Sequence, residues 1–354
     1  MNSPASPSTP QAVHRILDEA SGLDGVIVLH STRLGPAAGG CRLWHYKDVA
    51  SAAHDAMRLA EGMAYKNALA GLPLGGGKAV LRLPVGRFDR QRLFAAFGRE
   101  VENLGGAYVT AEDVGTSVAD MHTVSEHSSH VAGLAPKGDR PGGDPSPWTA
   151  LGVLLSMREA ARRRYGTSLS GLTIAVQGLG NVGSHLCALL HKDGARLVVA
   201  DTRADFAAHI AARYGATVVS PETIVTAPCD IFAPCALGGV IDDQLVRFIR
   251  THIVCGAANN VLATEEDGDR LAERGVLFAP DFVVNAGGII NVAAEYLDWS
   301  AKEAEERVRQ TGARLAEVLD YAERRGLPPH RAANALARDR MAGHGLQPVT
   351  AGAV

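Results

Sequence analysis

Two lysines, Lys66 and Lys78, flank an apolar turn and three consecutive glycines in the stretch KNALAGLPLGGGKAV. Successive glycines, here Gly75–Gly77, can adopt backbone conformations closed to other residues and let another group come very near. We therefore predict that an unobstructed loop presents Lys78 and that a ligand binds there. Apolar residues recur at helical spacing over residues 51–70, which predicts an amphipathic helix that holds Lys66 on a rigid element.

A second glycine pattern, GLGNVG, directly follows the apolar strand TIAVQ and opens a helix, the context in which this pattern binds dinucleotides. Gly178 permits the tight turn, Gly180 lets the backbone approach a pyrophosphate, and Gly183 allows the helix to pack closely on the strand. The helix N-terminus adds free N–H groups and the positive end of a dipole. We expect the whole turn to bind the cofactor: Gly178, Leu179, Gly180, Asn181, Val182 and Gly183.

An acidic residue, Asp201, ends the next strand, where a carboxylate can accept hydrogen bonds from the adenine ribose hydroxyls. This position favours NAD over NADP as the cofactor. Arg203, two residues further on, could pair with a 2′-phosphate, although Asp201 would then have to tolerate that charge nearby.

The order of predicted elements indicates an α/β protein. A helix is predicted over residues 88–104, and the strand after it, in GGAYVTAEDVGT, ends in a polar turn that contains Asp113. From LTIAVQG to GVLFAPD strands alternate with helices, which predicts a parallel, doubly wound sheet with helices on both faces. A charged helix over 301–325 and an amphipathic helix over 329–341 close the chain.

A chain of 354 residues is long enough for two domains that each bury a core. The segment KGDRPGGDPSP concentrates glycine, proline and charge, and predicts the boundary between them. We expect a disordered tail over 1–12, one domain over 13–140 and a second over 145–325. A C-terminal helix over 328–345 is expected to pack back on the first domain.

Composition excludes several classes of function. Apolar residues make up 46% of the chain and charged residues 21%, with a formal charge of −3, so the basic excess typical of nucleic-acid binding is missing. No apolar segment is long enough to span a bilayer, and the thirteen histidines show no metal-ligand spacing. Five cysteines without a CxxC pair fit a reducing cytoplasm.

Several long motifs then resemble a known family. GPAAGGCR, GMAYKNALAGLPLGGGKAV, TAEDVGTSVADM, VQGLGNVG, IFAPCALGGVI, GAANN and APDFVVNAGGIINV occur in the order and at about the spacing of the glutamate/leucine/phenylalanine/valine dehydrogenases. The resemblance runs from about Gly25 to Met341 and is greater to the leucine, valine and phenylalanine branch. It implies an N-terminal α/β domain for substrate binding and oligomerisation, a Rossmann domain for NAD, and a substrate cleft between them.

The resemblance also implies roles for the lysine motif. Lys66 is expected to hold the substrate carboxylate and Lys78 to take part in the chemistry, with Asp113 as the catalytic aspartate that moves protons to and from the amino group and the attacking water. A lysine that acts as a base near neutral pH needs a lowered pKa, which burial beside a second ammonium group supplies. The implied reaction is oxidative deamination: hydride leaves Cα for the nicotinamide, and water then displaces ammonia through a carbinolamine. The products are a 2-oxo acid, ammonium and NADH.

Further site residues follow from the resemblance alone. Gly39 and Gly40 match positions beside the substrate, and Asn260 and Asn285 match side chains that orient the substrate or the nicotinamide. Thr149 matches a threonine near the carboxamide. The dinucleotide path is expected to include the segment from Ala233 to Ala236, and within it Cys235 and Ala236.

Side-chain specificity is predicted from the expected pocket residues Ala38, Ala111, Ile289 and Val292. Glutamate enzymes carry a lysine where Ala38 stands and a serine where Val292 stands, so a glutamate side chain would bury an unpaired charge here. Alanine at 38 leaves room for a large side chain, as in phenylalanine enzymes, whereas TAEDVGT resembles the leucine and valine enzymes. We predict a branched-chain amino acid, with phenylalanine or a broad hydrophobic range as the alternative.

Two other functions would be compatible with part of these motifs. A non-catalytic, NAD-sensing oligomer would keep this fold, but the retention of Lys66, Lys78 and Asp113 argues against it. A 2-hydroxy-acid dehydrogenase would share the Rossmann domain but would need a histidine–carboxylate pair and an arginine for the substrate, and the lysine pair argues against that chemistry.

Overall fold

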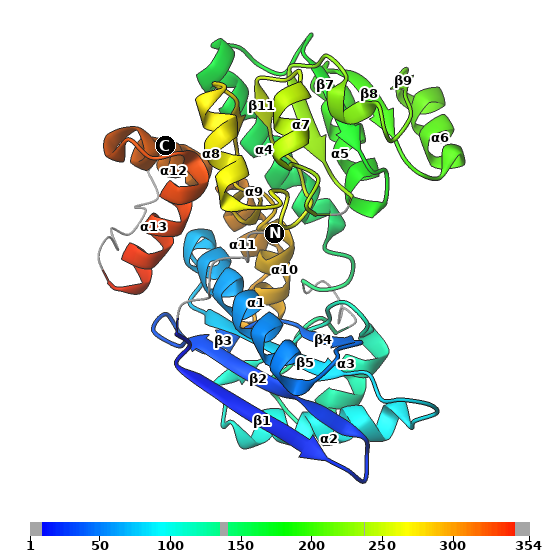
Figure 1. Cartoon of the computed structure of the whole chain (residues 1–354), viewed down its shortest axis with the longest axis vertical. Helices are drawn as coiled ribbons and strands as arrows, with labels where there is room; N and C mark the ends of the chain where they lie inside the picture. The colour runs from blue at the N-terminus through cyan, green and yellow to red at the C-terminus, as the bar shows by residue number, and fades with distance from the viewer. Residues whose placement is uncertain (1–8, 135–140, 237, 344–354) are drawn as a thin grey trace.

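The computed structural model describes residues 9–134, 141–236 and 238–343. Two α/β domains lie one above the other, and each is built on a six-stranded sheet (Figure 1). The α/β class and the two-domain organisation predicted from the sequence are confirmed. The proposed boundary segment lies partly in 135–140, outside the described residues, so the domain limits stay a prediction. Within the described ranges, no helix is long and apolar enough to cross a membrane.

The first domain follows the order β1 (Ala12–Asp18), β2 (Leu23–Ser31), β3 (Ala37–Ala38), β4 (Cys41–Trp44), α1 (Val49–Ala70), β5 (Gly75–Arg82), α2 (Arg90–Asn103), β6 (Tyr108–Val109) and α3 (Val118–Ser125). Its sheet has the order β1-β2-β5-β3-β6, with β4 also paired to β5. Strands β1, β2 and β5 are antiparallel, whereas β3 and β4 run parallel to β5. Strand β5 is therefore the centre of this domain.

Helices cover both faces of this sheet (Figure 1). Along β2, Val26 and Val28 pack with α1, whereas the alternate residues Ile27 and Leu29 pack with α2. Successive side chains of a strand point to opposite faces of the sheet, so this alternation shows that β2 is buried on both faces. The face of α1 that packs there is made of alanines, which let the helix lie close to the sheet: Ala52, Ala56 and Ala60.

The glycines before Lys78 do not form a loop, so that prediction was wrong. Gly75–Gly77 are buried and begin the central strand β5. A Cβ atom on Gly76 would lie 2.3 Å from the backbone nitrogen of Ala64 in α1, closer than real Cβ atoms come. The glycines are needed because helix and strand meet at backbone distance, which is the close approach that glycine permits.

The second domain follows the order α4 (Ser146–Tyr165), β7 (Thr173–Gln177), α5 (Asn181–Lys192), β8 (Arg196–Ala200), α6 (Ala204–Tyr214), β9 (Thr217–Val218), a short 3-10 turn (Ile224–Thr226), β10 (Ile231–Pro234), α7 (Asp243–Phe248), β11 (Ile253–Val254), α8 (Glu265–Glu273) and β12 (Leu277–Phe278). All its strand pairs are parallel, in the order β12-β11-β10-β7-β8-β9. The order reverses at β7, which is the switch point where doubly wound sheets bind ligands.

Five helices complete the chain: α9 (Asp281–Val284), α10 (Gly287–Tyr296), α11 (Ala301–Arg309), α12 (Thr311–Arg325) and α13 (Pro329–Met341). The single helix predicted over 301–325 is in fact α11 and α12. In an unbroken helix, the carbonyl of Val308 would accept from the backbone N–H of residue 312. Here the Thr311 hydroxyl donates to that carbonyl at 2.6 Å, at the point where α11 gives way to α12.

The last helix, α13, packs on α1 (Figure 1). Ala333, Leu336 and Ala337 share one apolar core with Tyr65, Ala68 and Leu69 of α1. The Arg340 guanidinium donates to the carbonyls of Ala68 and Leu69 at 3.0 and 3.2 Å. Both carbonyls belong to the last turn of α1, and that of Ala68 also accepts from the Gly71 N–H, so Arg340 adds a donor from α13 to this helix end.

The predicted tail lies mostly in residues 1–8, which are outside the described residues. At its end the prediction of disorder was wrong. Gln11 donates from its backbone N–H to His30, and Ala12 already belongs to β1. Pairing with β2 orders these residues despite their proline-rich surroundings.

We expect Gly76→Ala to destabilise the protein, because the new methyl group would overlap the backbone of α1. Overpacking of this kind costs about 1–3 kcal/mol or more. Gly62→Ala is the matched control, since Gly62 is a helical residue of α1 with nothing near its Cβ position, and alanine should stabilise the helix by roughly 0.5–1 kcal/mol. Urea unfolding measures the free energy of unfolding of both variants. Equal stability of the two variants would contradict the close contact.

Candidate active site

Lys78 and Asp113 form an ion pair at the centre of the first domain. Lys78 is 5% exposed on β5, and its Nζ lies 2.8 Å from Asp113 Oδ2. Arg42 on β4 adds a second contact, with its Nε 3.2 Å from the same oxygen. Burial alone would raise the pKa of Asp113, but the Lys78 ammonium and Arg42 hold it below its usual range. Asp113 is therefore a carboxylate at neutral pH.

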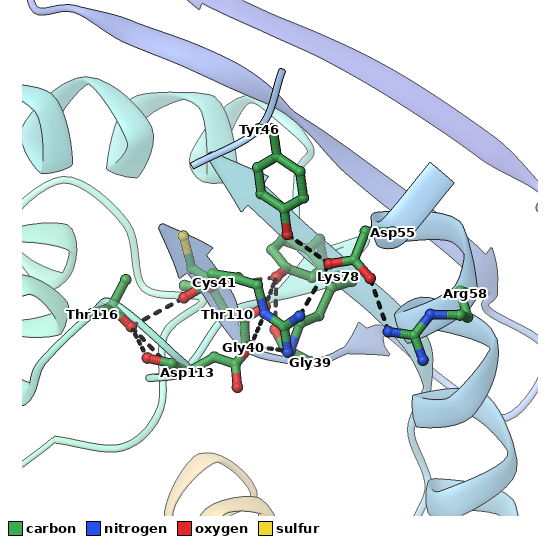
Figure 2. Close-up of polar contacts among 12 residues, drawn as sticks. Gly39, Gly40, Cys41, Tyr46, Asp55, Arg58, Lys78, Thr110, Asp113 and Thr116 are labelled. Carbon is green, nitrogen blue, oxygen red and sulfur yellow. Dashed lines mark hydrogen bonds and ion pairs between the residues drawn. The ribbon is translucent and has the colours of Figure 1, made fainter. Parts of the chain in front are cut away.

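A tight turn after β6 holds Asp113 in place (Figure 2). The Thr116 hydroxyl accepts from the backbone N–H of Asp113 at 2.9 Å and lies 3.0 Å from the carbonyl of Cys41. Gly40 lies beside this turn, where a Cβ atom would be 2.8 Å from Asp113 Cβ. Gly39 packs as closely on β5, since its Cβ would be 1.9 Å from the carbonyl oxygen of Gly77. Both predicted glycines thus adjoin the lysine–aspartate pair.

Lys66 lies near the end of α1 and points to the second domain. Its Nζ donates to Asn259 Oδ1 at 3.1 Å, and the Asn285 amide donates to the same oxygen at 2.9 Å. Burial and, to a smaller extent, the Lys78 ammonium lower the pKa of Lys66 to about 8, while the Asp281 and Asp113 carboxylates act in the opposite direction. The lowering of one lysine pKa by a second ammonium group, expected from the sequence, therefore acts on Lys66.

The asparagine that joins the domains is Asn259, which the sequence analysis missed. The prediction named Asn260, the next residue of GAANN. Asn260 has a backbone φ of 52° and its carbonyl accepts from Gly239. The motif marked the correct turn, but only the three-dimensional structure shows that the first asparagine reaches Lys66.

Two of the expected pocket residues, Ala38 and Ile289, lie in one apolar cluster between β3 and α10. Ala111 and Val292 are partly exposed and are not members of this cluster as the described residues define it. Trp148 packs against the same cluster, a contact that no sequence motif predicted. Trp148 is thus a further candidate for contact with a substrate side chain.

Thr149 lies where α4 meets the start of α10. A Cβ on Gly288 would be 2.9 Å from Thr149 Oγ1, and one on Gly287 would be 2.1 Å from the carbonyl oxygen of Trp148. The two glycines of NAGG therefore let α10 begin directly against α4. Asn285, just before them, also donates to the Ala257 carbonyl at 3.1 Å.

The glycine turn after β7 has the geometry that the sequence predicted. Gly178 has a φ of 91°, and a Cβ there would be 2.8 Å from that of Ala236. Gly183 packs on the turn, with its Cβ position 2.0 Å from the Gly178 carbonyl oxygen and 3.6 Å from Cys235 Cβ. Gly180 faces open space, and no side chain caps the first N–H groups of α5. These free N–H groups suit a pyrophosphate.

Asp201 joins the ends of β7 and β8. Its Oδ2 accepts from the Leu179 N–H at 2.7 Å and its Oδ1 from the Arg203 N–H at 2.9 Å. Burial would raise the pKa of Asp201, but these backbone N–H groups and Arg203 hold it below its usual range. The Arg203 guanidinium stacks on Phe206, 3.5 Å from the ring centre.

Beside Asp201 is a pocket of about 530 Å³ that the sequence analysis did not identify. It is lined by Asp201, Thr202, Ala204, Ala207, Val218, Val219, Ser220, Pro221 and Glu222. Most of these residues follow the ends of β8 and β9, the edge where doubly wound sheets bind ligands. Of these residues, the sequence motifs predicted Asp201 alone.

Comparison with known proteins decides the family. The profile of the glutamate/leucine/phenylalanine/valine dehydrogenase dimerisation domain matches residues 10–130, and the profile of the main domain of these enzymes matches 144–204 and 199–346. The chain belongs to the glutamate/leucine/phenylalanine/valine dehydrogenase family. The resemblance stated from the motifs is thereby confirmed, and the cofactor of this amino-acid dehydrogenase is NAD.

Individual members of the family are also similar over most of their length. The leucine dehydrogenase of Bacillus subtilis is 45% identical, covering 92% of this chain and 89% of the relative. The valine dehydrogenase of Streptomyces coelicolor is 44% identical, covering 92% and 90%. The crystal structure of L-tryptophan dehydrogenase from Nostoc punctiforme superposes with a TM-score of 0.85 at 37% identity, covering 94% of this chain and 96% of that one.

We expect Asp201→Ser to narrow the preference for NAD over NADP, because it removes a carboxylate that would repel a 2′-phosphate and leaves Arg203 able to pair with it. The ratio of kcat/KM for the two cofactors measures the change. Adding Arg203→Ala should cancel the gain with NADP. A wild-type enzyme that uses both cofactors equally well would contradict this assignment of Asp201.

Proposed function

We propose that this dehydrogenase oxidatively deaminates a branched-chain L-amino acid of the leucine and valine type to its 2-oxo acid and ammonium. The observation that carries the proposal is the buried Lys78–Asp113 ion pair beside Lys66, at the junction with the Rossmann domain. We also propose that it acts in the cytoplasm, which its five free cysteines support.

Bound NAD would accept the hydride, and the chain's own groups would handle charge and protons. Among the described residues no carboxylate forms an ion pair with the partly buried Lys66 ammonium, although Asp281 and Asp113 act on it from a distance, so a substrate carboxylate would give it a direct counter-charge. Asp113 Oδ2 is within hydrogen-bond distance of Lys78 Nζ, so a proton can pass between them. We propose that this pair exchanges protons with the substrate amino group and with the attacking water.

The apolar cluster around Ala38 and Ile289 supports a hydrophobic substrate. Neither Ala38 nor Val292 can pair with a distal carboxylate, so glutamate would be a poor substrate. The similarity to leucine and valine dehydrogenases supports a branched side chain. The similarity to an L-tryptophan dehydrogenase, together with the small Ala38, supports a broader range that includes aromatic side chains as the second candidate.

The test is a spectrophotometric screen of the purified protein with NAD and each amino acid at alkaline pH. Leucine, isoleucine or valine should give the highest kcat/KM, and glutamate should give none that is detectable. A higher value for phenylalanine or tryptophan would establish the second candidate. NADH binding without any amino-acid oxidation would instead establish the non-catalytic sensor.

We expect Lys78→Ala and Asp113→Asn to lower kcat by orders of magnitude while leaving NADH affinity unchanged, because each removes one partner of the proton-transferring pair. Stopped-flow turnover and NADH fluorescence titration measure the two quantities. Wild-type rates in either variant would refute the role of this pair.

Lys66 should determine how substrate binding depends on pH. Its pKa of about 8 means that the ammonium is present below pH 8 and is lost as the pH rises above it. Affinity for a branched carboxylate without an amino group should therefore fall as the pH rises through about 8. Lys66→Arg should bind this inhibitor with little pH dependence, because guanidinium stays charged. An equal decline in both proteins would exclude Lys66 as the anchor.

We further propose that the chain forms a homodimer through strand β1. This strand ends the sheet and pairs only with β2 among the described strands. It exposes two apolar side chains, Val13 at 48% and Leu17 at 56%. An unpaired apolar edge is a template for a second strand, and the matched dimerisation-domain profile covers it. Val13→Lys with Leu17→Lys should lower the sedimentation coefficient, whereas Phe248→Lys, at a more exposed apolar site in the second domain, should not.

A further inference from the structure

Arg42 contacts two carboxylates through different nitrogen atoms. Its Nε lies 3.2 Å from Asp113 Oδ2 and its Nη1 lies 3.0 Å from Asp55 Oδ2. Arg42 is only about one-fifth exposed, and β4 holds it in register with Val80 of β5. The guanidinium group is planar and rigid. Holding its Nη1 atom on Asp55 therefore sets the direction in which its Nε atom points, toward Asp113.

Asp55 is itself held by other side chains. The Tyr46 hydroxyl donates to Asp55 Oδ2 at 2.6 Å, and Arg58 donates to Oδ1 at 2.9 Å (Figure 2). Asp55 also belongs to α1, the helix that carries Lys66. The chain of contacts therefore connects Asp113 to the same rigid element that positions Lys66.

We propose that Arg42 is a positioning residue for the reaction, holding Asp113 against Lys78, and that Asp55 and Tyr46 hold Arg42. The inference rests on the proposed function, since it assigns a purpose to Asp113 as the proton-transferring carboxylate. Without Arg42, the carboxylate of Asp113 would keep the Lys78 ammonium and the backbone N–H of Val114 as partners and would lose its contact with β4. The second cation, approaching from β4, fixes its orientation.

An alternative is that Arg42 only stabilises the fold, as many partly buried ion pairs do. The Arg82–Asp24 pair provides a matched control for this possibility. It joins β5 and β2 at 2.6 Å, with exposures of 30% and 27%, and Asp113 is not among its partners within the described residues. Arg82→Gln should therefore change stability without changing turnover.

The experiment compares Arg42→Gln, Arg42→Lys and Arg82→Gln at saturating NAD. We expect Arg42→Gln to lower kcat by about 10²-fold, the effect typical of a misplaced catalytic group, while the KM for the amino acid and the affinity for NADH stay unchanged. Arg42→Lys should lower kcat almost as much, because an ammonium cannot reach both carboxylates in the geometry of the fork. Arg82→Gln should keep the wild-type kcat.

Chemical rescue separates positioning from folding. In Arg42→Ala, added guanidinium ion should raise kcat in a concentration-dependent manner, whereas it should not raise the kcat of Asp113→Asn. If the Arg42 variants do not fold, Tyr46→Phe carries the test. It removes one hydrogen bond to the charged Asp55 and should lower kcat by up to about tenfold with KM unchanged.

The outcomes distinguish the two levels of inference. A wild-type kcat in Arg42→Gln overturns the positioning role. If the Arg42 variants do not fold, a wild-type kcat in Tyr46→Phe overturns it instead. An equal loss of kcat in Arg82→Gln does so as well. If Asp113→Asn is inactive while Arg42→Gln is fully active, this inference fails and the proposed function stands. If the wild-type protein oxidises no amino acid, the proposed function itself fails.

Discussion

The backbone contact between β5 and α1 determines the geometry of the whole site. At Gly76 the strand comes so close to Ala64 that no side chain fits between them. Lys66 and Lys78 each follow this contact by two residues, and because α1 and β5 run in opposite directions they lie on either side of it. Their ammonium groups are then close enough for Lys78 to lower the pKa of Lys66. A wider gap between strand and helix would separate the two charges.

The charges around the site are unevenly compensated. Lys78 and Arg42 share the carboxylate of Asp113, whereas among the described residues Lys66 donates to the neutral amide oxygen of Asn259 and interacts with the Asp281 carboxylate only from a distance. A partly buried cation without a full counter-charge is costly, and an anion that arrives there relieves that cost. This imbalance supports the proposal that a substrate carboxylate binds at Lys66 while Asp113 exchanges protons.

Local patterns predicted the Rossmann domain well, because its turn, helix start and acidic residue are neighbours in sequence. Gly178, Gly183 and Asp201 have contacts that follow from motif and position alone. Gly75–Gly77 were mistaken for a loop because consecutive glycines are rare inside a buried strand, and only the close approach of α1 explains them. The role of Asn259 was missed because its partner Lys66 is distant along the chain. Arg42 was missed for a similar reason, since its contacts depend on the pairing of β4 with β5.

The contact between α13 and α1 has a consequence for how the protein is made. Arg340 caps carbonyls of Ala68 and Leu69, which lie 272 and 271 residues earlier in the chain. A ribosome-bound nascent chain therefore exposes the end of the Lys66 helix until α13 has been synthesised. Domains generally fold from the N-terminus during synthesis, yet here the N-terminal domain is completed by a helix that follows the whole Rossmann domain in the sequence.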